Sequence, residues 1–320
     1  MLEQINATTW RFALPSGEVG WIGDPDNLTA FRPHLKLAKW GGEGAISAEF
    51  PLVGSLTPRV IGDAIEVIKG DYKLRWYPKA GAELGGYEFE IILGKKPPIN
   101  VLELPFASQG LKAIYQSSQT AQEVAAGFVR PDNVVGSYAI YHAAREALHK
   151  VQAEAAKYRT GKAFHIYRPL LIDALGRKSW AGLSISAGKL TITADPAWLA
   201  GATYPVVVDP TFGWSSIGAS NTGADANQVR ATLFTTPSDM STVDSITFYA
   251  SGSGISYKGL IYTHVDLNLI TNGVGGAAAL GASAGWVTST FATPPSPGAS
   301  VAVLLGEIHN GLCTIYYDNG

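Results

Sequence analysis

The chain has 320 residues, enough for two domains of ordinary size. Hydrophobic residues make up 46% of it and charged residues only 16%, whereas a typical soluble domain has about 25% charged residues. The net charge of −2 and the lack of a basic run argue against a nucleic-acid partner, because duplex binding needs clustered Lys and Arg.

Residues 1–105 are predicted to form short strands separated by turns. Apolar residues alternate, or gather in short runs, over the ranges 8–14, 19–22, 31–40, 45–50, 64–68, 72–77 and 87–93. The last two ranges alternate strictly, with Lys73 and Arg75 on one face of the first and Glu88 and Glu90 on one face of the second. Opposite charges at facing positions favour pairing, so we predict that these two strands are neighbours.

The middle of the chain adds the predicted helices. Thr120 and Glu123 have the spacing of a capping box, which predicts a short helix. An Ala-rich run predicts one long helix over residues 142–158, about 25 Å long. Asp195 and Pro196 suit the start of a single helical turn. Strands are predicted over 100–106, 111–115, 133–141, 162–167, 170–172, 179–185, 189–194 and 204–208.

The composition changes at Gly213, after which charge almost vanishes and Ser, Thr, Gly and Ala dominate. We predict a mainly β protein in two domains: a β-rich anchoring domain with the long helix at residues 1–212, and a jelly-roll-like β-sandwich at residues 213–320. Either the strand at residues 312–317 is the last of its sheet, or a further strand completes the sheet. Such a strand would come from another chain or from a missing tail. The strands predicted here cover 228–234, 245–250, 258–264, 285–291, 299–305 and 312–317.

Three patterns could carry catalysis, and each has a simpler interpretation. Residues 281–285 match the G-x-S-x-G motif, but a strand follows where that motif needs a helix, so a flexible loop is favoured. His142 and His149 are seven residues apart, whereas zinc pairs on a helix are four apart. His165 and Asp173 could form a dyad, but the sequence places no nucleophile beside them. We therefore predict no catalytic residue and no bound cofactor.

The single cysteine, Cys313, excludes an internal disulfide and a multi-cysteine metal site. The turns at Asp24–Asn27 and Asp225–Asn227 supply the oxygen ligands that calcium prefers, but neither has the spacing of a known calcium loop. Ordinary turns have the same composition. We name Asp225 and Asn227 as the better calcium candidates and predict no other metal site.

Aromatic residues of the second domain could stack on sugar rings, although most aromatic side chains in a β-sandwich pack in its core. The candidates for contact with a cell-surface glycan are Trp214, Tyr257, Tyr262 and Trp286, with Tyr249 as a further exposed aromatic.

Three phrases together resemble a family of proteins encoded by tailed phages and prophages, to which no catalytic residues are assigned. They cover residues 130–142 (RPDNVVGSYAIYH), 158–169 (YRTGKAFHIYRP) and 202–213 (ATYPVVVDPTFG). The Ser- and Gly-rich sequence after them resembles the sandwich domains of phage fibres and carbohydrate-binding surface proteins. The resemblance implies a structural role in a particle.

We therefore expect a non-enzymatic virion protein, either a tail-associated fibre or adhesin subunit or a head decoration subunit. It would be assembled in the host cytoplasm and homo-oligomeric, with other virion proteins as partners. No secretion signal and no membrane span are expected, because no stretch approaches about 18 apolar residues. The alternatives are a carbohydrate-binding surface protein that uses the sandwich, and a glycan hydrolase, which would need two carboxylates about 5–9.5 Å apart.

Overall fold

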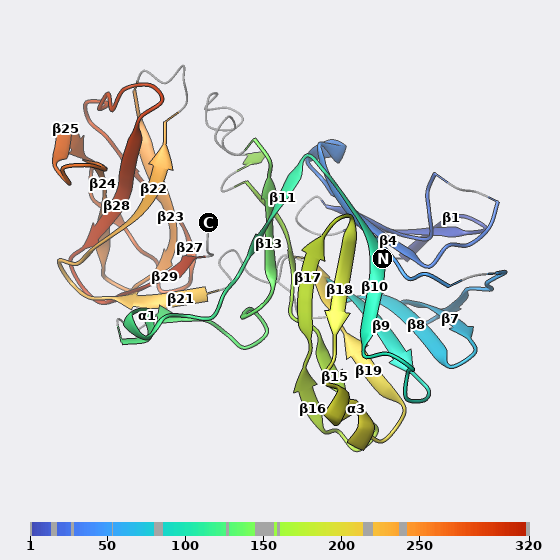
Figure 1. The fold of residues 1–320 in the computed structure, drawn as a ribbon. Helices are drawn as coiled ribbons and strands as arrows, with labels where there is room; N and C mark the ends of the chain where they lie inside the picture. Colours follow the sequence, from blue (N-terminus) through green and yellow to red (C-terminus); the bar gives the residue numbers. More distant parts are fainter. Residues whose placement is uncertain are drawn as a thin grey trace.

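The computed structural model describes residues 2–13, 18–26, 29–52, 54–79, 86–125, 128–144, 157–158, 161–213, 220–236 and 242–317. The chain is mainly β, with 55% of its residues in strands and 6% in helices, which confirms the predicted class at this level. Figure 1 shows the strands from β21 (Ser220–Ala224) onward on one side of the molecule and two large sheets on the other.

The first large sheet has eight antiparallel strands. It begins as a meander and ends in a hairpin from later in the chain, and β10 joins the two parts by pairing with both β5 and β18. In order across the sheet, the strands are β1 (Leu2–Asn6), β2 (Thr9–Ala13), β3 (Val19–Ile22), β4 (His34–Lys39), β5 (Gly44–Glu49), β10 (Val101–Gln109), β18 (Lys189–Thr193) and β17 (Gly182–Ser186). A 3₁₀ turn, η1 (Trp40–Gly42), connects β4 to β5.

The second large sheet divides at Pro210. β19 (Val206–Asp209) and β20 (Thr211–Gly213) both pair with one edge of β9 (Gly86–Leu93), and Pro210 between them has no N–H to donate to the ladder. From β19 the sheet continues through β15 (Leu170–Ile172) to β16 (Lys178–Trp180). From β20 it continues through β14 (Lys162–Ile166) and β13 (Tyr138–His142) to β11 (Leu111–Tyr115). The opposite edge of β9 carries β8 (Tyr72–Pro78), β7 (Ala64–Lys69) and β6 (Arg59–Ile61).

The predicted neighbours β8 and β9 do pair, although only one of the predicted charge pairs forms. Arg75 lies opposite Glu90, with 3.7 Å between Nη1 and Oε2. Lys73 lies opposite Ile92, so its ammonium group instead reaches Glu66 on β7, at 2.9 Å. The sequence pattern therefore predicted correctly which strands are neighbours. It did not predict the register, which decides which charged residues lie opposite each other.

The two large sheets share one hydrophobic core. Buried residues from Trp10 on β2 to Phe212 on β20 form a continuous cluster, in which the rings of Trp76 and Phe89 stack with centroids 4.9 Å apart. These rings are fully buried, as the strict alternation of their strands predicts.

The strands after Gly213 form two further five-stranded sheets, which we call the C-terminal sandwich. One early strand, β12 (Phe128–Val129), joins it by pairing with β21. The first sheet has the order β12, β21, β29 (Cys313–Tyr317), β23 (Ser245–Ser251) and β27 (Gly285–Thr290). The second has the order β22 (Val229–Thr235), β28 (Ala302–His309), β24 (Ser256–Thr263) and β25 (Leu269–Val274), with β26 (Ala278–Ala279) also on β24. Buried residues of both sheets meet in two small clusters, around Tyr257 and around Ile261.

The short helices begin where their capping residues predict. Glu123 accepts from the N–H and hydroxyl of Thr120, whose hydroxyl accepts from the Glu123 N–H, at the start of α1 (Ala121–Ala125). The side chain of Asp195 accepts the N–H of Ala197 at the start of α3 (Pro196–Gly201).

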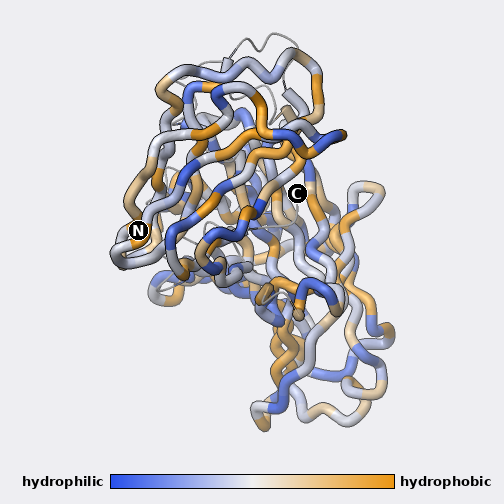
Figure 2. The backbone as a smooth tube through the Cα atoms, turned by 90° about the vertical axis from the view of Figure 1, so that its left-hand side faces the viewer, coloured by the Kyte–Doolittle hydropathy of each residue, from blue (hydrophilic) through white to orange (hydrophobic). Residues whose placement is uncertain are grey.

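The predicted long helix over residues 142–158 has a different outcome. His142 ends strand β13, so the helix does not begin there, because residues 138–142 are held between β11 and β14. Residues 145–156 lie outside the described residues. Within the described ranges, no helix reaches seven residues. None of these helices could cross a membrane, and the hydropathy of the chain changes at short intervals (Figure 2).

Candidate functional site

The residues singled out for catalysis are not brought together in the described part of the chain. Ser283 lies in an exposed loop that leads into β27, with no helix after it. His142 contacts the rings of Trp40 and Tyr158, and its Nε2 lies 4.0 Å from a carboxylate oxygen of Glu43. His149 lies outside the described residues. The described ones among these positions supply no nucleophile next to a base.

His165 and Ser137 do form a close pair, but it is sealed in the core. The Ser137 hydroxyl lies 2.6 Å from Nε2 of His165, and both side chains have no exposed surface. Asp173 is not their partner, because its carboxylate binds Arg177 and the Thr203 N–H. No substrate can reach this pair, which instead ties the residue before β13 to β14.

The metal candidates are exposed turns whose carboxylates already have partners. Asp24 binds Arg32, and Asp26 binds Lys36. Asp225 accepts from the side chain of Gln228 at 3.4 Å, and the Asn227 N–H donates to the His309 carbonyl, so both hold the turn between β21 and β22. Over the described ranges, no group of three or more His, Cys, Asp or Glu side chains is placed to hold a metal.

Cys313 is buried in the sandwich, and burial raises the pKa of its thiol to about 11. At neutral pH it is therefore a neutral core side chain rather than a thiolate nucleophile.

A carboxyl pair that sequence reasoning missed lies beside the division of the second sheet. Burial, reinforced by the neighbouring Glu88, raises the pKa of Asp209 to about 8. The two oxygens of Glu88 are bound by Lys79 and by the Thr211 hydroxyl, the latter at 2.7 Å. Because these groups already bind Glu88, we interpret the pair as a structural cluster, in which burial favours the protonated form of Asp209.

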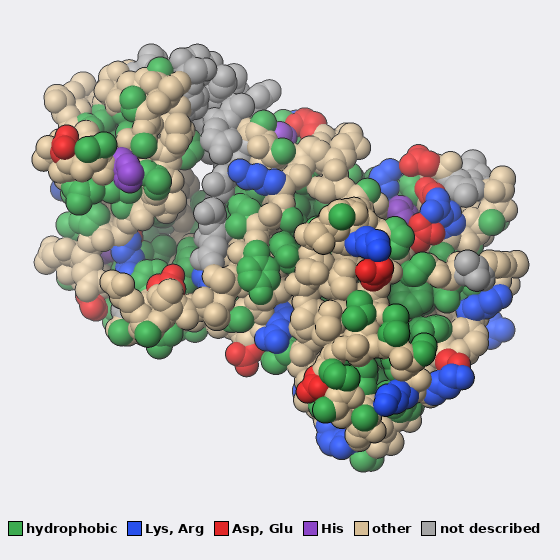
Figure 3. Space-filling model, viewed as in Figure 1, with side chains coloured by type: hydrophobic (Ala, Val, Ile, Leu, Met, Phe, Trp, Pro, Cys, Tyr) green, Lys and Arg blue, Asp and Glu red, His purple; other side chains and the backbone are tan. Residues whose placement is uncertain are grey.

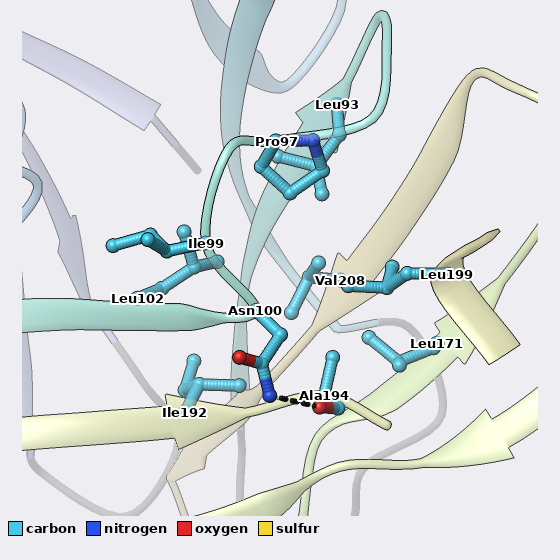
Figure 4. Close-up of a pocket in the computed structure, with 10 residues that line it drawn as sticks. All are labelled: Leu93, Pro97, Ile99, Asn100, Leu102, Leu171, Ile192, Ala194, Leu199 and Val208. Atoms are coloured by element: carbon cyan, nitrogen blue, oxygen red, sulfur yellow. Dashed lines mark hydrogen bonds between the residues drawn. The ribbon is translucent and has the colours of Figure 1, made fainter. Parts of the chain in front are cut away.

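A small cavity lies between the two large sheets beneath α3 (Figure 4). Its volume of about 10 Å³ has room for one water molecule. Apolar side chains line it, and the one amide there, Asn100, is used in a 2.8 Å bond to the Ala194 carbonyl. The cavity is a packing gap rather than a ligand site.

The surfaces of the C-terminal sandwich hold the remaining candidates. Charged side chains are numerous over the N-terminal sheets and sparse over this part of the molecule (Figure 3). Of the four predicted glycan-contact residues, Trp214 lies outside the described residues. Tyr257 is a core residue, which corrects the prediction: its hydroxyl donates to the Ile246 carbonyl at 2.9 Å. Tyr262 and Trp286 lie on opposite outer faces.

Trp286 belongs to a row of aromatic side chains across the first sheet of the sandwich. It lies opposite Tyr249 on β23, whose ring in turn contacts that of Tyr316 on β29. The ring centroids are 5.3 and 5.6 Å apart, and all three residues are half-buried. The alternate residues Phe248 and Val287 pack inward, so this aromatic row faces outward.

The second sheet presents a different outer face, which we call the aliphatic face. Exposed fractions of 45% for Val229, 55% for Leu233, 44% for Leu269 and 44% for Val274 show that it is uncovered in the single chain. The half-buried or buried side chains between them are Leu260, Tyr262, Leu304 and Ile308. Among its strand residues the only charged side chain that faces outward is Lys258.

Comparison with known proteins gives no matching family model and no matching curated protein. Among solved structures, the chain is similar to a glycoside hydrolase family 43 arabinoxylan arabinofuranohydrolase from Bacillus subtilis, crystallised with cellotetraose. The sequence identity is 9% and the TM-score 0.22, over all of this chain and 78% of the other. Likeness at this level places the chain in no fold family.

Proposed function

We propose that this chain is a structural subunit of a tailed-phage particle, exposed as a fibre, adhesin or head decoration protein and assembled through contacts between its own copies. The observation that carries the proposal is the uncovered aliphatic face of the sandwich. The three phage-like phrases of the sequence supply the particle context.

The size of the aliphatic face supports an interface. Four strands of about seven residues, at about 4.8 Å between strands and about 3.3 Å per residue, cover roughly 400 Å². Apolar patches of about 300–600 Å² are the largest that monomers usually expose, and they are often functional. Covering an apolar face of this extent with another surface is favourable, because it removes apolar area from water.

The occupant that fits this face best is a second copy of the chain. Lys258 is its only outward charge, so two copies can meet across a twofold axis with little like-charge repulsion. Because the same residues contribute on both sides, one substitution changes the interface twice.

The proposal is tested by locating the protein and by breaking its assembly. Mass spectrometry and antibody labelling of purified particles from the encoding phage or prophage should find the chain on the particle surface. In light scattering of the purified chain, Leu233→Asp should weaken self-association by about tenfold or more. Leu175→Asp is the control, because Leu175 is also exposed, at 71% against 55% for Leu233, but lies in a turn of the N-terminal sheets.

A wild-type chain that stays monomeric at all concentrations would contradict assembly through this face. Particles that form without the chain, and never contain it, would contradict the virion role.

A further inference from the structure

The first sheet of the sandwich has an unusual composition. Its five strands, β12, β21, β29, β23 and β27, contain no Lys, Arg, Asp, Glu or His. Outward-facing positions instead carry the aromatic row and small polar residues. A ligand of this face therefore gains nothing from a net charge.

Polar side chains border the aromatic row on both sides. On one side, the hydroxyls of Thr247 and Thr288 lie opposite each other, 2.8 Å apart. On the other side, Ser251 lies opposite Thr314. Asn221 lies opposite Tyr316 and extends the row itself by one strand. The face thus combines a central apolar stripe with hydroxyl and amide groups along its margins.

We propose that this face binds a neutral glycan. The C–H face of a sugar ring is weakly positive and packs on the negative face of an aromatic ring, while its hydroxyls need donors and acceptors at the edge of the contact. The aromatic row supplies the ring faces for stacking, and the bordering Thr, Ser and Asn side chains supply the hydrogen-bond donors and acceptors. The aliphatic face instead carries mainly aliphatic side chains at its outward positions and has no comparable row of aromatic rings, which separates the two surfaces chemically.

The spacing of the row indicates an oligosaccharide rather than a single sugar. Trp286 and Tyr316 lie two strands apart, which is about 10 Å at the usual strand spacing. The ring of Tyr249 between them is inclined by 66° to Trp286 and by 69° to Tyr316. The two outer rings are thus separate stacking positions, so affinity should rise with glycan length until both are covered.

The full chain should be tested on an array of neutral and acidic oligosaccharides, followed by calorimetry with the best neutral ligand and its shorter fragments. Trp286→Ala and Tyr316→Ala should each weaken binding by about tenfold, the loss of roughly 1.4 kcal/mol expected for one stacking contact. Tyr262→Ala on the aliphatic face is the matched control and should bind normally.

A measurement on the unmodified chain guards against variants that fail to fold. Saturating glycan should protect Trp286 from N-bromosuccinimide, as read by peptide mass spectrometry. The proposal is overturned if no neutral glycan binds, if acidic glycans bind better, or if Trp286 stays unprotected. It is also overturned if Trp286→Ala changes the oligomeric state and leaves glycan binding intact, which would make the row a protein interface. Self-association through the aliphatic face is measured with a different variant, Leu233→Asp, so the two proposals fail separately.

Discussion

The N-terminal sheets and the C-terminal sandwich use similar strands but are stabilised differently. The N-terminal sheets enclose one continuous core, with fully buried aromatic residues such as Trp76 and Phe89. The sandwich has two small clusters, and one of its outer faces leaves Leu233 and Val229 exposed. An alternating pattern of strands is therefore not enough to make a region stable by itself. The apolar area that the region encloses decides how much of its stability must come from contacts with its neighbours.

The largest expected effect comes from removing one phenylalanine from each core. Phe89→Ala should lower the free energy of unfolding by about 3–5 kcal/mol, because the surrounding core cannot collapse into the cavity. Phe291→Ala, in a small cluster of the sandwich, should cost less because its surroundings can relax. Urea unfolding followed by circular dichroism measures both. Equal losses would remove the distinction between the two regions.

The second test concerns a buried contact between a histidine and a carboxylate in the sandwich. In the sandwich, Nε2 of His309 contacts a carboxylate oxygen of Glu307, and both side chains are almost fully buried. In the described part of the chain, the Glu307 oxygens have no other hydrogen-bond partner, so the His309 imidazole is the polar group that they contact. His309→Ala should therefore cost about 3–4 kcal/mol in urea unfolding, because it leaves a buried carboxyl group alone.

The double variant Glu307→Leu with His309→Phe tests the reason for that loss. Replacing both partners by apolar groups should restore most of the stability. A double variant as unstable as His309→Ala would show that packing, not charge, explains the effect.

The structure also explains what the sequence could predict. The alternation of apolar and polar residues was sufficient to locate β8 and β9. The helix starts at Thr120 and Asp195 were predictable because each depends on residues at most three positions away. The aromatic row was only partly found, because Trp286 and Tyr316 become neighbours of Tyr249 through pairings between distant segments. Tyr257 was misplaced for a related reason: period-two alternation does not say which face of a strand is the core.

A third prediction uses the carboxyl group of Asp209 in the N-terminal sheets. Its folded-state pKa of about 8 lies above the ordinary value of 3.8, so folding favours the protonated form. This contribution to stability is fully present below about pH 4 and is lost as pH rises through 8. Asp209→Asn should remove that slope between pH 4 and 8 in urea titrations. An unchanged slope would place the titration elsewhere.

The smallest expected effect is at α1, which precedes the strand that crosses into the sandwich. Thr120→Ala removes half of the capping box and should cost about 0.5–1 kcal/mol. Because β12 begins three residues after α1 ends, the loss should raise hydrogen exchange in β12 and β21 more than in β9. Asp195→Ala, at the cap of α3, is the control and should leave β12 unchanged.

The division of the second sheet at Pro210 has a mechanical consequence. β20 lies between β9 and β14, and its antiparallel hydrogen bonds run perpendicular to the chain. A pull on the chain beyond Gly213, directed along β20, loads these bonds together in shear rather than opening them one after another. Pro210 separates β20 from β19. The force is therefore transferred to both β9 and β14 over the three residues of β20. We therefore expect the boundary between the two regions to resist tension along β20.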